Sequence, residues 1–217
     1  MGDAMNIKTD PMQGGFTLED ILRDTLDSTY IDDAYYAKLR HDMVEWDGKG
    51  MLLSEAERHI YEALITEENW LLDRRAFERW YQLYSRKCIY WVPAVGDLPD
   101  PVRADPQRQV TIAFDDRRRL GDRIVWLRTG VAYSQLPPSY TSHISTAFVR
   151  MPSENKSEVK VRSQFLIQEM RAGHEIQTFS GWMGHVFVEE DGITKIDRKV
   201  VCLLDAPRSH HNMTFLL

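Results

Sequence analysis

Cysteine is scarce in this sequence, and its scarcity removes a large block of chemistry. The 217 residues include only Cys88 and Cys202, with no Cys-x-x-Cys pair and no histidine beside them at the spacing of a metal site. A structural zinc site or a self-contained iron–sulfur cluster needs more ligands than these. We expect both thiols to be small buried hydrophobes. A disulfide between them is the less favoured reading, because nothing in the sequence indicates an oxidising compartment.

Long apolar runs are missing as well. No stretch approaches the roughly 20 apolar residues that span a bilayer, and residues 1–8 lack the apolar core of a signal peptide. These absences predict a cytoplasmic protein. The 27 basic residues against 33 acidic ones give a net charge of −6, which argues against broad binding to nucleic acid or anionic membranes.

Familiar cofactor and nucleophile motifs do not occur. The chain has no G-x-x-x-x-G-K-S/T, no G-x-G-x-x-G and no G-x-S-x-G motif, so neither a phosphate loop nor a nucleophile elbow is predicted. Its seven histidines are scattered, without an H-E-x-x-H pair. An iron site of two histidines and one carboxylate, assembled from distant strands, is therefore only a minor alternative.

What is present divides the chain into an N-terminal arm, residues 1–53, and one α+β domain, residues 54–217. The arm is polar and acidic, with glycine-rich breaks that flank two short predicted helices. One begins after Thr17 and runs to about Leu26, and the other spans residues 34–44. The arm carries too little apolar surface to fold alone, so it packs either on its own domain or on a neighbouring subunit, and the two readings are equally open.

The first half of the domain reads as helical. Ser54 and Glu57 form a capping box that predicts a helix over about 54–72. A stripe of aromatic residues from Phe77 to Tyr84 predicts a second helix packed on the core. A strand is expected over 86–92, then a loop over 96–106 and a polar helix over 115–128, whose arginine run at 117–119 is read as a solvated face.

From Thr141 onward the hydrophobic period changes to two. Four strands are expected, over 141–151, 158–171, 175–190 and 193–205, and Asp191-Gly192 is a strong hairpin signal. In the second strand the apolar side chains alternate with polar ones, among them Lys160 and Arg162. Helices followed by such a meander predict an α+β domain with a helical layer on one face of an antiparallel sheet.

A cone-shaped cavity between helices and sheet would be the place for catalysis. Its candidate residues are Tyr61, Asp73, Tyr90 and His143, with Asp73 or His143 as the acid–base group and a tyrosine as oxyanion donor. For Asp73, an ion pair or a helix cap beside Arg74 and Arg75 is the simpler explanation. For His143 the simpler one is a hydrogen-bonded core or interface histidine. An independent isomerase or dehydratase is therefore the alternative function.

Several short stretches carry a family resemblance, in a fixed order across residues 54–217. They are Leu72-Asp73-Arg74-Arg75-Ala76-Phe77-Glu78-Arg79-Trp80, Tyr90-Trp91-Val92-Pro93, Phe114-Asp115-Asp116, Leu127-Arg128-Thr129-Gly130, Pro137-Pro138-Ser139, Val161-Arg162-Ser163-Gln164-Phe165 and Asn212-Met213-Thr214-Phe215-Leu216-Leu217. Together they resemble the small (beta) subunit of bacterial aromatic-ring-hydroxylating dioxygenases, which are Rieske non-haem iron oxygenases. The N-terminal arm does not align with that pattern.

The resemblance implies an α+β fold of the nuclear-transport-factor-2-like or cystatin-like kind. It also implies a partner, the large (alpha) subunit, which holds the Rieske 2Fe–2S cluster and the mononuclear Fe(II). This chain would then carry no catalytic, cofactor-binding or metal-binding residue and would support an assembly usually of three alpha and three beta chains. Electrons would reach the partner from NAD(P)H through a reductase, with or without a ferredoxin.

Subunit contacts are expected where apolar side chains would be costly to expose. The candidates are Trp182 and Phe187 on the outer face of the meander, together with Phe215, Leu216 and Leu217. The aromatic substrate and the nature of the product, a cis-dihydrodiol or a phenol, are left open by the sequence.

Overall fold

Four helices of the protein begin at side-chain caps, at Thr17, Asp32, Ser54 and Asp116. The computed structural model describes residues 16–24, 28–94, 104–206, 213 and 216–217. Its helices are α1 (Leu18–Arg23), α2 (Asp33–Trp46), α3 (Glu55–Glu57), α4 (Ala63–Asp73), α5 (Phe77–Gln82) and α6 (Arg117–Thr129), with a π-helical turn η2 (Arg58–Glu62) and a 3-10 turn η4 (Tyr133–Gln135). The capping box at Ser54 is confirmed. The helix predicted over 54–72 is thus α3, η2 and α4 in succession.

The described strands form a single curved sheet. Its strands are β1 (Met51–Leu52), β2 (Tyr84–Pro93), β3 (Thr111–Asp116), β4 (Tyr140–Met151), β5 (Val159–Met170), β6 (Gln177–Glu190) and β7 (Ile193–Leu203). They lie in the order β1-β4-β5-β6-β7-β2-β3, and every pairing is antiparallel except that of β2 with β7. The four predicted strands, β4 to β7, are confirmed, but they form the centre of a seven-stranded sheet to which β1 and β3, not predicted as strands, add the two edges.

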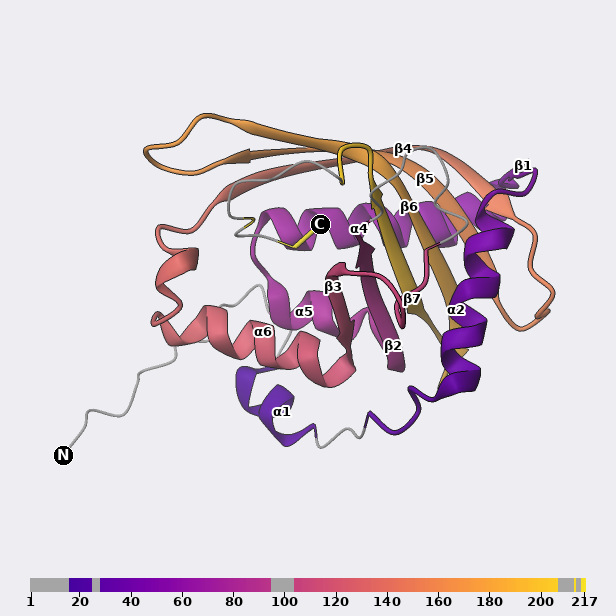
Figure 1. Cartoon of the computed structure of the whole chain (residues 1–217), viewed down its shortest axis with the longest axis horizontal. Coiled ribbons are helices and arrows are strands. Elements are labelled where there is room, and N and C mark those ends of the chain that lie inside the picture. The colour runs from indigo at the N-terminus through magenta and orange to yellow at the C-terminus, as the bar shows by residue number, and fades with distance from the viewer. Residues whose placement is uncertain (1–15, 25–27, 95–103, 207–212, 214–215) are drawn as a thin grey trace.

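The sheet curls around α4 and α5, as Figure 1 shows, while α2 crosses its opposite, outer face. On the inner face, α4, α5 and α6 enclose the larger hydrophobic core, which includes Trp80, Tyr81, Tyr84 and Phe187. The aromatic stripe predicted as core is therefore confirmed. Cys88 and Cys202 are both buried free thiols, as expected.

The described part of the arm packs on its own domain. Leu39, Met43 and Trp46 of α2 form a second core with residues of β2, β6 and β7 on the outer face. Gly184 on β6 makes this approach possible, because a Cβ at that position would lie only 2.6 Å from the Trp46 ring. Leu26, where the first arm helix was expected to end, lies outside the described residues, and α1 ends at Arg23.

Arg117, expected on a solvated face, and Lys160, expected on the polar side of a strand, are both buried. Arg117, the first residue of α6, donates from Nη1 to the main-chain oxygen of Tyr84 at 2.8 Å and lies 3.5 Å above the Tyr81 ring. Lys160, on the polar side of the predicted alternation, is 2% exposed because α2 covers it. Alternation along a strand assigns a residue to a face of the sheet but does not show whether a helix covers that face.

Candidate functional site

Asp73 and His143, the two acid–base candidates, lie in direct contact. Asp73 is the last residue of α4, and its Oδ1 atom lies 2.6 Å from Nδ1 of His143 on β4. The same carboxylate accepts hydrogen bonds from the main-chain N–H of His143 at 3.1 Å and from the Thr141 hydroxyl at 2.9 Å. Asp73 is thus hydrogen-bonded to His143, and this contact joins the end of α4 to β4.

The other ring nitrogen of His143 is also engaged. Nε2 lies 3.1 Å from the main-chain oxygen of Leu216, and the side chain is only 2% exposed. The cavity beside the pair, bordered by Thr141, His143 and Leu216, measures about 40 Å³, whereas ligand pockets begin at about 300 Å³. Acid–base catalysis needs a nitrogen within reach of a substrate proton, so this arrangement does not favour the isomerase or dehydratase alternative.

The two candidate tyrosines do not complete such a site. The Tyr90 hydroxyl donates to the main-chain oxygen of Leu217 at 2.8 Å and accepts from its N–H at 2.9 Å. Tyr61 packs against Phe187, with ring centroids 5.0 Å apart. The four candidates therefore do not form one catalytic site. Asp73 and His143 contact each other, His143 and Tyr90 contact Leu216 and Leu217, and Tyr61 packs against the core.

A buried carboxylate that the sequence did not single out lies deeper in the cone. Glu68 of α4 is fully buried and contacts Lys199 Nζ at 3.0 Å, His185 Nε2 at 2.9 Å and the Tyr84 hydroxyl at 2.5 Å. Burial alone would raise the pKa of Glu68, but the charge of Lys199 and the hydrogen bond from His185 hold it well below its usual range. Burial lowers the pKa of His185, so a neutral imidazole donates to an ionised Glu68.

The position of Glu68 in the helix is a signal that could have found it. It lies three residues after Ile65 and three before Leu71, which are both fully buried, so it shares their face of α4. A carboxylate on the apolar face of a helix requires a buried cationic partner. Lys199, on a strand far along the chain, is that partner.

A second ionic cluster joins α2 to the outer face of the sheet. Asp42 of α2 accepts from Arg198 Nε at 2.6 Å, and Lys160 Nζ contacts both Asp42 and Glu45. Arg198 also reaches Glu158 through Nη2 at 2.5 Å. Burial would raise the pKa of Glu158, but Arg198 and Lys38 lower it to about 2. This cluster has partners for each of its charges and is structural.

Metal-ligating side chains do not gather in the part of the chain that the structure describes: no three of its His, Cys, Asp and Glu residues are grouped to hold an ion. His210 and His211 lie outside the described residues. Within those same bounds, no helix is long and apolar enough to cross a membrane.

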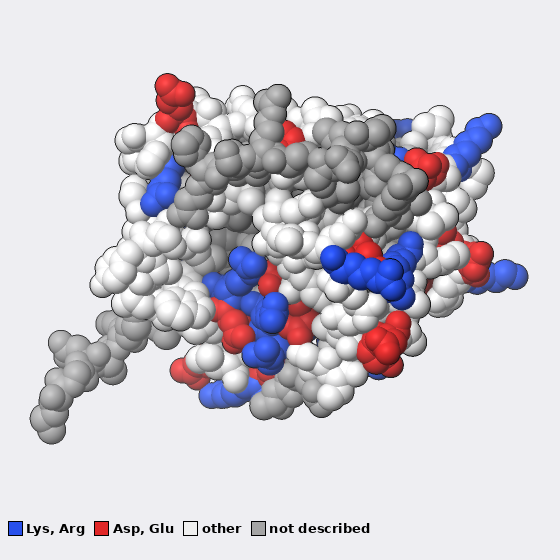
Figure 2. Space-filling view, in the orientation of Figure 1, with Lys and Arg blue, Asp and Glu red and all other residues white. Residues whose placement is uncertain are grey.

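Beyond α2, no described helix covers the outer side of β4, β5 and β6. Arg162, at the border with α2, places its guanidinium 4.5 Å from the centroid of the Trp182 ring, and the other described side chains of this face are uncharged. We call this outer side the open sheet face, and it consists of Tyr140, Ser142, Ile144, Thr146, Gln164, Leu166, Gln168, Met170, Thr178, Ser180 and Trp182, all exposed or half-buried. The strand register sets these residues side by side, as in the row Ile144, Leu166 and Ser180. In Figure 2, by contrast, Lys, Arg, Asp and Glu gather over α6. In a chain with 28% charged residues, such a face is typical of a contact surface.

Of the predicted interface residues, Trp182 belongs to the open sheet face and the others that can be placed do not. Trp182 is half-buried, with its ring centroid 6.3 Å from that of Trp46. Phe187 is 1% exposed in the inner core, because residues five apart in a strand point to opposite faces. Leu216 and Leu217 are 7% and 3% exposed within this chain's own core. They are therefore already buried and need no partner subunit to cover them. Phe215 lies outside the described residues.

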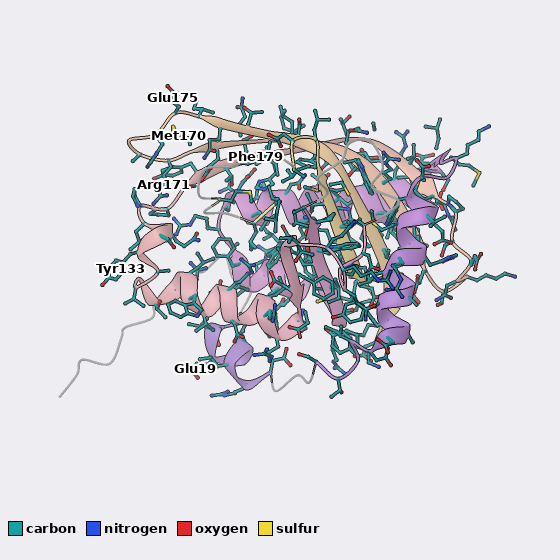
Figure 3. All side chains as sticks on the ribbon, in the orientation of Figure 1. Glu19, Tyr133, Met170, Arg171, Glu175 and Phe179 are labelled. Atoms are coloured by element: carbon teal, nitrogen blue, oxygen red, sulfur yellow. The ribbon has the colours of Figure 1, made fainter. Side chains whose placement is uncertain are left out.

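One end of the molecule carries exposed aromatic and apolar side chains from separate elements. Figure 3 shows Tyr133 of η4 below Met170 and Arg171 at the end of β5, and Arg171 Nη2 donates to the main-chain oxygen of Leu136 at 2.7 Å. A cleft of about 550 Å³ opens here between α6 and η4, with Trp126 and Tyr133 on its walls and Leu216 on its border. Leu216 therefore separates this cleft from the Asp73–His143 pair.

Comparison with known proteins identifies the family. Residues 67–207 match the family described as the ring hydroxylating beta subunit. The chain belongs to this family. Among curated beta-subunit relatives, the small oxygenase component of the p-cumate 2,3-dioxygenase system of Pseudomonas putida is 30% identical over 74% of this chain and 87% of its own length. The 2-halobenzoate 1,2-dioxygenase small subunit of Burkholderia cepacia is 26% identical over 64% of this chain and 84% of its own length.

Solved structures show the same fold. A chain of naphthalene 1,2-dioxygenase with bound indole superposes with a TM-score of 0.67 at 18% identity, covering 86% of this chain and all of that one. The beta subunit of benzoate 1,2-dioxygenase from Burkholderia mallei gives a TM-score of 0.54 at 21% identity over 70% of this chain and 92% of its own. The resemblance read from the sequence motifs, and the helix-on-curved-sheet fold it implied, are confirmed.

Proposed function

We propose that this ring-hydroxylating dioxygenase beta subunit binds a large, iron-bearing alpha subunit and supports its assembly into an oxygenase of three alpha and three beta chains. The observation that carries the proposal is the match of residues 67–207 to the beta-subunit family. In this assignment the chain supplies structure, and the oxidation of the aromatic ring takes place on the partner. The full oxygenase works in the cytoplasm, where NAD(P)H supplies electrons through a reductase, with or without a ferredoxin.

The chemistry of the two cysteines supports placing the Rieske 2Fe–2S cluster and the mononuclear Fe(II) on the partner. Iron–sulfur ligation requires thiolates. Burial raises the pKa of Cys202 to about 12 and raises that of Cys88 further. Both groups are therefore protonated thiols inside hydrophobic cores.

The open sheet face, with Trp182 at its edge beside α2, is the surface that we assign to the subunit contact. Apart from Arg162 at its border with α2, its described side chains are uncharged, and it carries Tyr140, Ile144, Leu166 and Met170, of which Tyr140 is 69% exposed. Aromatic and aliphatic side chains without charge are what the centre of a stable interface contains. A sheet face of this kind left in water would also favour aggregation.

The first experiment is to purify the tagged chain from cells that make its oxygenase and to measure native mass and iron content. We expect an equimolar complex with a larger chain that holds the iron and the acid-labile sulfide. A metal-free chain that purifies alone from cells containing the large subunit would contradict the assembly proposal.

The contact surface is tested by placing a charge on it. Ile144→Glu on the open sheet face is compared with Val44→Glu on α2, because the two side chains are similarly exposed, at 53% and 55%. We expect Ile144→Glu to weaken the complex at least about tenfold, since a buried unpaired charge costs several kcal/mol, while the thermal stability of the free chain stays the same. Equal loss of assembly in both variants, or in neither, would contradict the assignment of this face.

A further inference from the structure

The pair Leu216–Leu217 is held in the cone almost as a bound peptide would be. Both residues are buried, yet neither belongs to a helix or a strand. Their main-chain polar atoms are instead met by side chains: the oxygen of Leu216 by His143 Nε2 at 3.1 Å, and the oxygen of Leu217 by the Tyr90 hydroxyl at 2.8 Å and Lys199 Nζ at 2.9 Å. Buried main-chain groups need hydrogen-bond partners, and here side chains of the domain supply them in place of a helix or a sheet.

Two of the side chains that make these contacts, His143 and Lys199, are themselves held by carboxylates of α4. Asp73 holds His143 at 2.6 Å, and Glu68 holds Lys199 at 3.0 Å. Both carboxylates lie on α4, while His143 and Lys199 lie on β4 and β7. Supporting partners that orient a contacting side chain are the mark of a preorganised binding site.

The contacts that position His143, Tyr90 and Lys199 do not involve Leu216 or Leu217. β2, which carries Tyr90, is paired with β7, which carries Lys199, and the contacts of Asp73 with His143 and of Glu68 with Lys199 join α4 to β4 and β7 directly. Leu216 also borders the open cleft of about 550 Å³. Removal of the pair would therefore connect this cleft to a formed polar site in the interior of the cone.

We propose that the cone contains a peptide-binding site for an apolar dipeptide, that residues 216–217 of this chain are its resident ligand, and that the site accepts such a peptide in trans when they are absent. Its specificity has two parts. Lys199, Tyr90 and His143 require main-chain oxygens that accept hydrogen bonds, and the surrounding core, which includes Leu72 and Phe77, requires apolar side chains. The site is separate from the open sheet face, so its test does not depend on the assembly proposal.

The experiment uses the chain with Leu216 and Leu217 deleted, and the probe acetyl-Thr-Phe-Leu-Leu, which repeats the sequence of residues 214–217. By calorimetry we expect one peptide to bind per shortened chain and to raise its Tm. Acetyl-Thr-Phe-Gly-Gly should not bind, since it keeps the main chain and lacks the apolar side chains. The complete chain should bind neither peptide, because its own residues fill the site.

Tyr90→Phe supplies the sharper measurement, because the hydrogen bonds of the Tyr90 hydroxyl are those to Leu217. In the shortened chain this substitution should weaken peptide binding about tenfold, as expected for loss of a buried hydrogen bond, and leave the Tm of the peptide-free protein unchanged. Tyr35→Phe is the matched control, since its hydroxyl donates to the main-chain oxygen of Lys87 instead and should leave the affinity unchanged.

If the shortened chain does not fold, the complete chain carrying Leu216→Asp and Leu217→Asp replaces it, because charged side chains cannot occupy the apolar site. The same peptide should then raise the Tm of this variant and not that of the parent chain. A folded variant that binds no peptide, equal binding of both peptides, or an affinity unaffected by Tyr90→Phe would overturn the proposal.

Discussion

Arg198 and Lys199 are neighbours on β7, yet they hold helices on opposite faces of the sheet. Arg198 points outward and pairs with Asp42 of α2 at 2.6 Å, while Lys199 points inward and pairs with Glu68 of α4 at 3.0 Å. The outer charge has several partners, since Glu158 and Asp197 also contact Arg198. Among the described residues, Glu68 is the carboxylate that contacts Lys199. Both faces therefore hold a helix through a buried ion pair, but the outer cation has additional side-chain carboxylate partners among the described residues and the inner one does not.

The largest effect is expected on the inner face. Glu68→Gln removes the side-chain carboxylate that faces Lys199 and leaves the buried ammonium with the oxygen of Leu217. We expect the free energy of unfolding to fall by about 3–5 kcal/mol, measured by urea denaturation. Glu67→Gln, one residue earlier on the exposed side of α4, is the matched control and should change stability by at most about 0.5 kcal/mol. Equal losses in the two variants would show that Glu68 has no special role.

A smaller effect is expected on the outer face. Asp42→Asn leaves Arg198 with Glu158 and Asp197, and leaves Lys160 with Glu45. We expect a loss of about 1–3 kcal/mol in the same assay, the range for a buried hydrogen bond to a charged group. A loss larger than that of Glu68→Gln would reverse the comparison, since it would mean that the additional carboxylates do not compensate.

The sequence predicted the individual helices and strands better than it predicted which face of the sheet is covered. Local signals predicted the elements well: the capping box at Ser54 begins a helix, and Asp191-Gly192 forms a hairpin turn with both residues at positive φ. Alternation assigned β5 residues to the correct faces. It did not show that α2 covers Lys160, since that contact joins segments far apart in the chain.

The candidate site was predicted in part. Asp73 and His143 were singled out for their chemistry, and the structure brings them together. Their engagement by Leu216 could not be predicted, because the sequence does not show where residues 216–217 fold back. Glu68 was missed because a glutamate within a helix usually faces water. Its spacing from Ile65 and Leu71 was the signal available.

The third predicted effect concerns acid. The pKa of Glu158 is lowered to about 2 from its ordinary 4.5, so its contribution to stability is complete above pH 4.5 and is lost as the pH falls toward 2. Stability measured by denaturation across this range should fall in the parent chain and fall less steeply in Glu158→Gln. Glu154→Gln, whose side chain is 82% exposed, should follow the parent. Identical slopes in all three proteins would contradict the role of Glu158.

The absence of a side chain at Gly184 has a consequence for the ionic cluster on the outer face. A Cβ at this position would lie 2.6 Å from the Trp46 ring, so its absence sets how closely the end of α2 approaches the sheet. A bulkier residue there would displace α2 from the sheet and expose the buried Arg198 cluster to water, so this glycine keeps the outer ionic cluster dry.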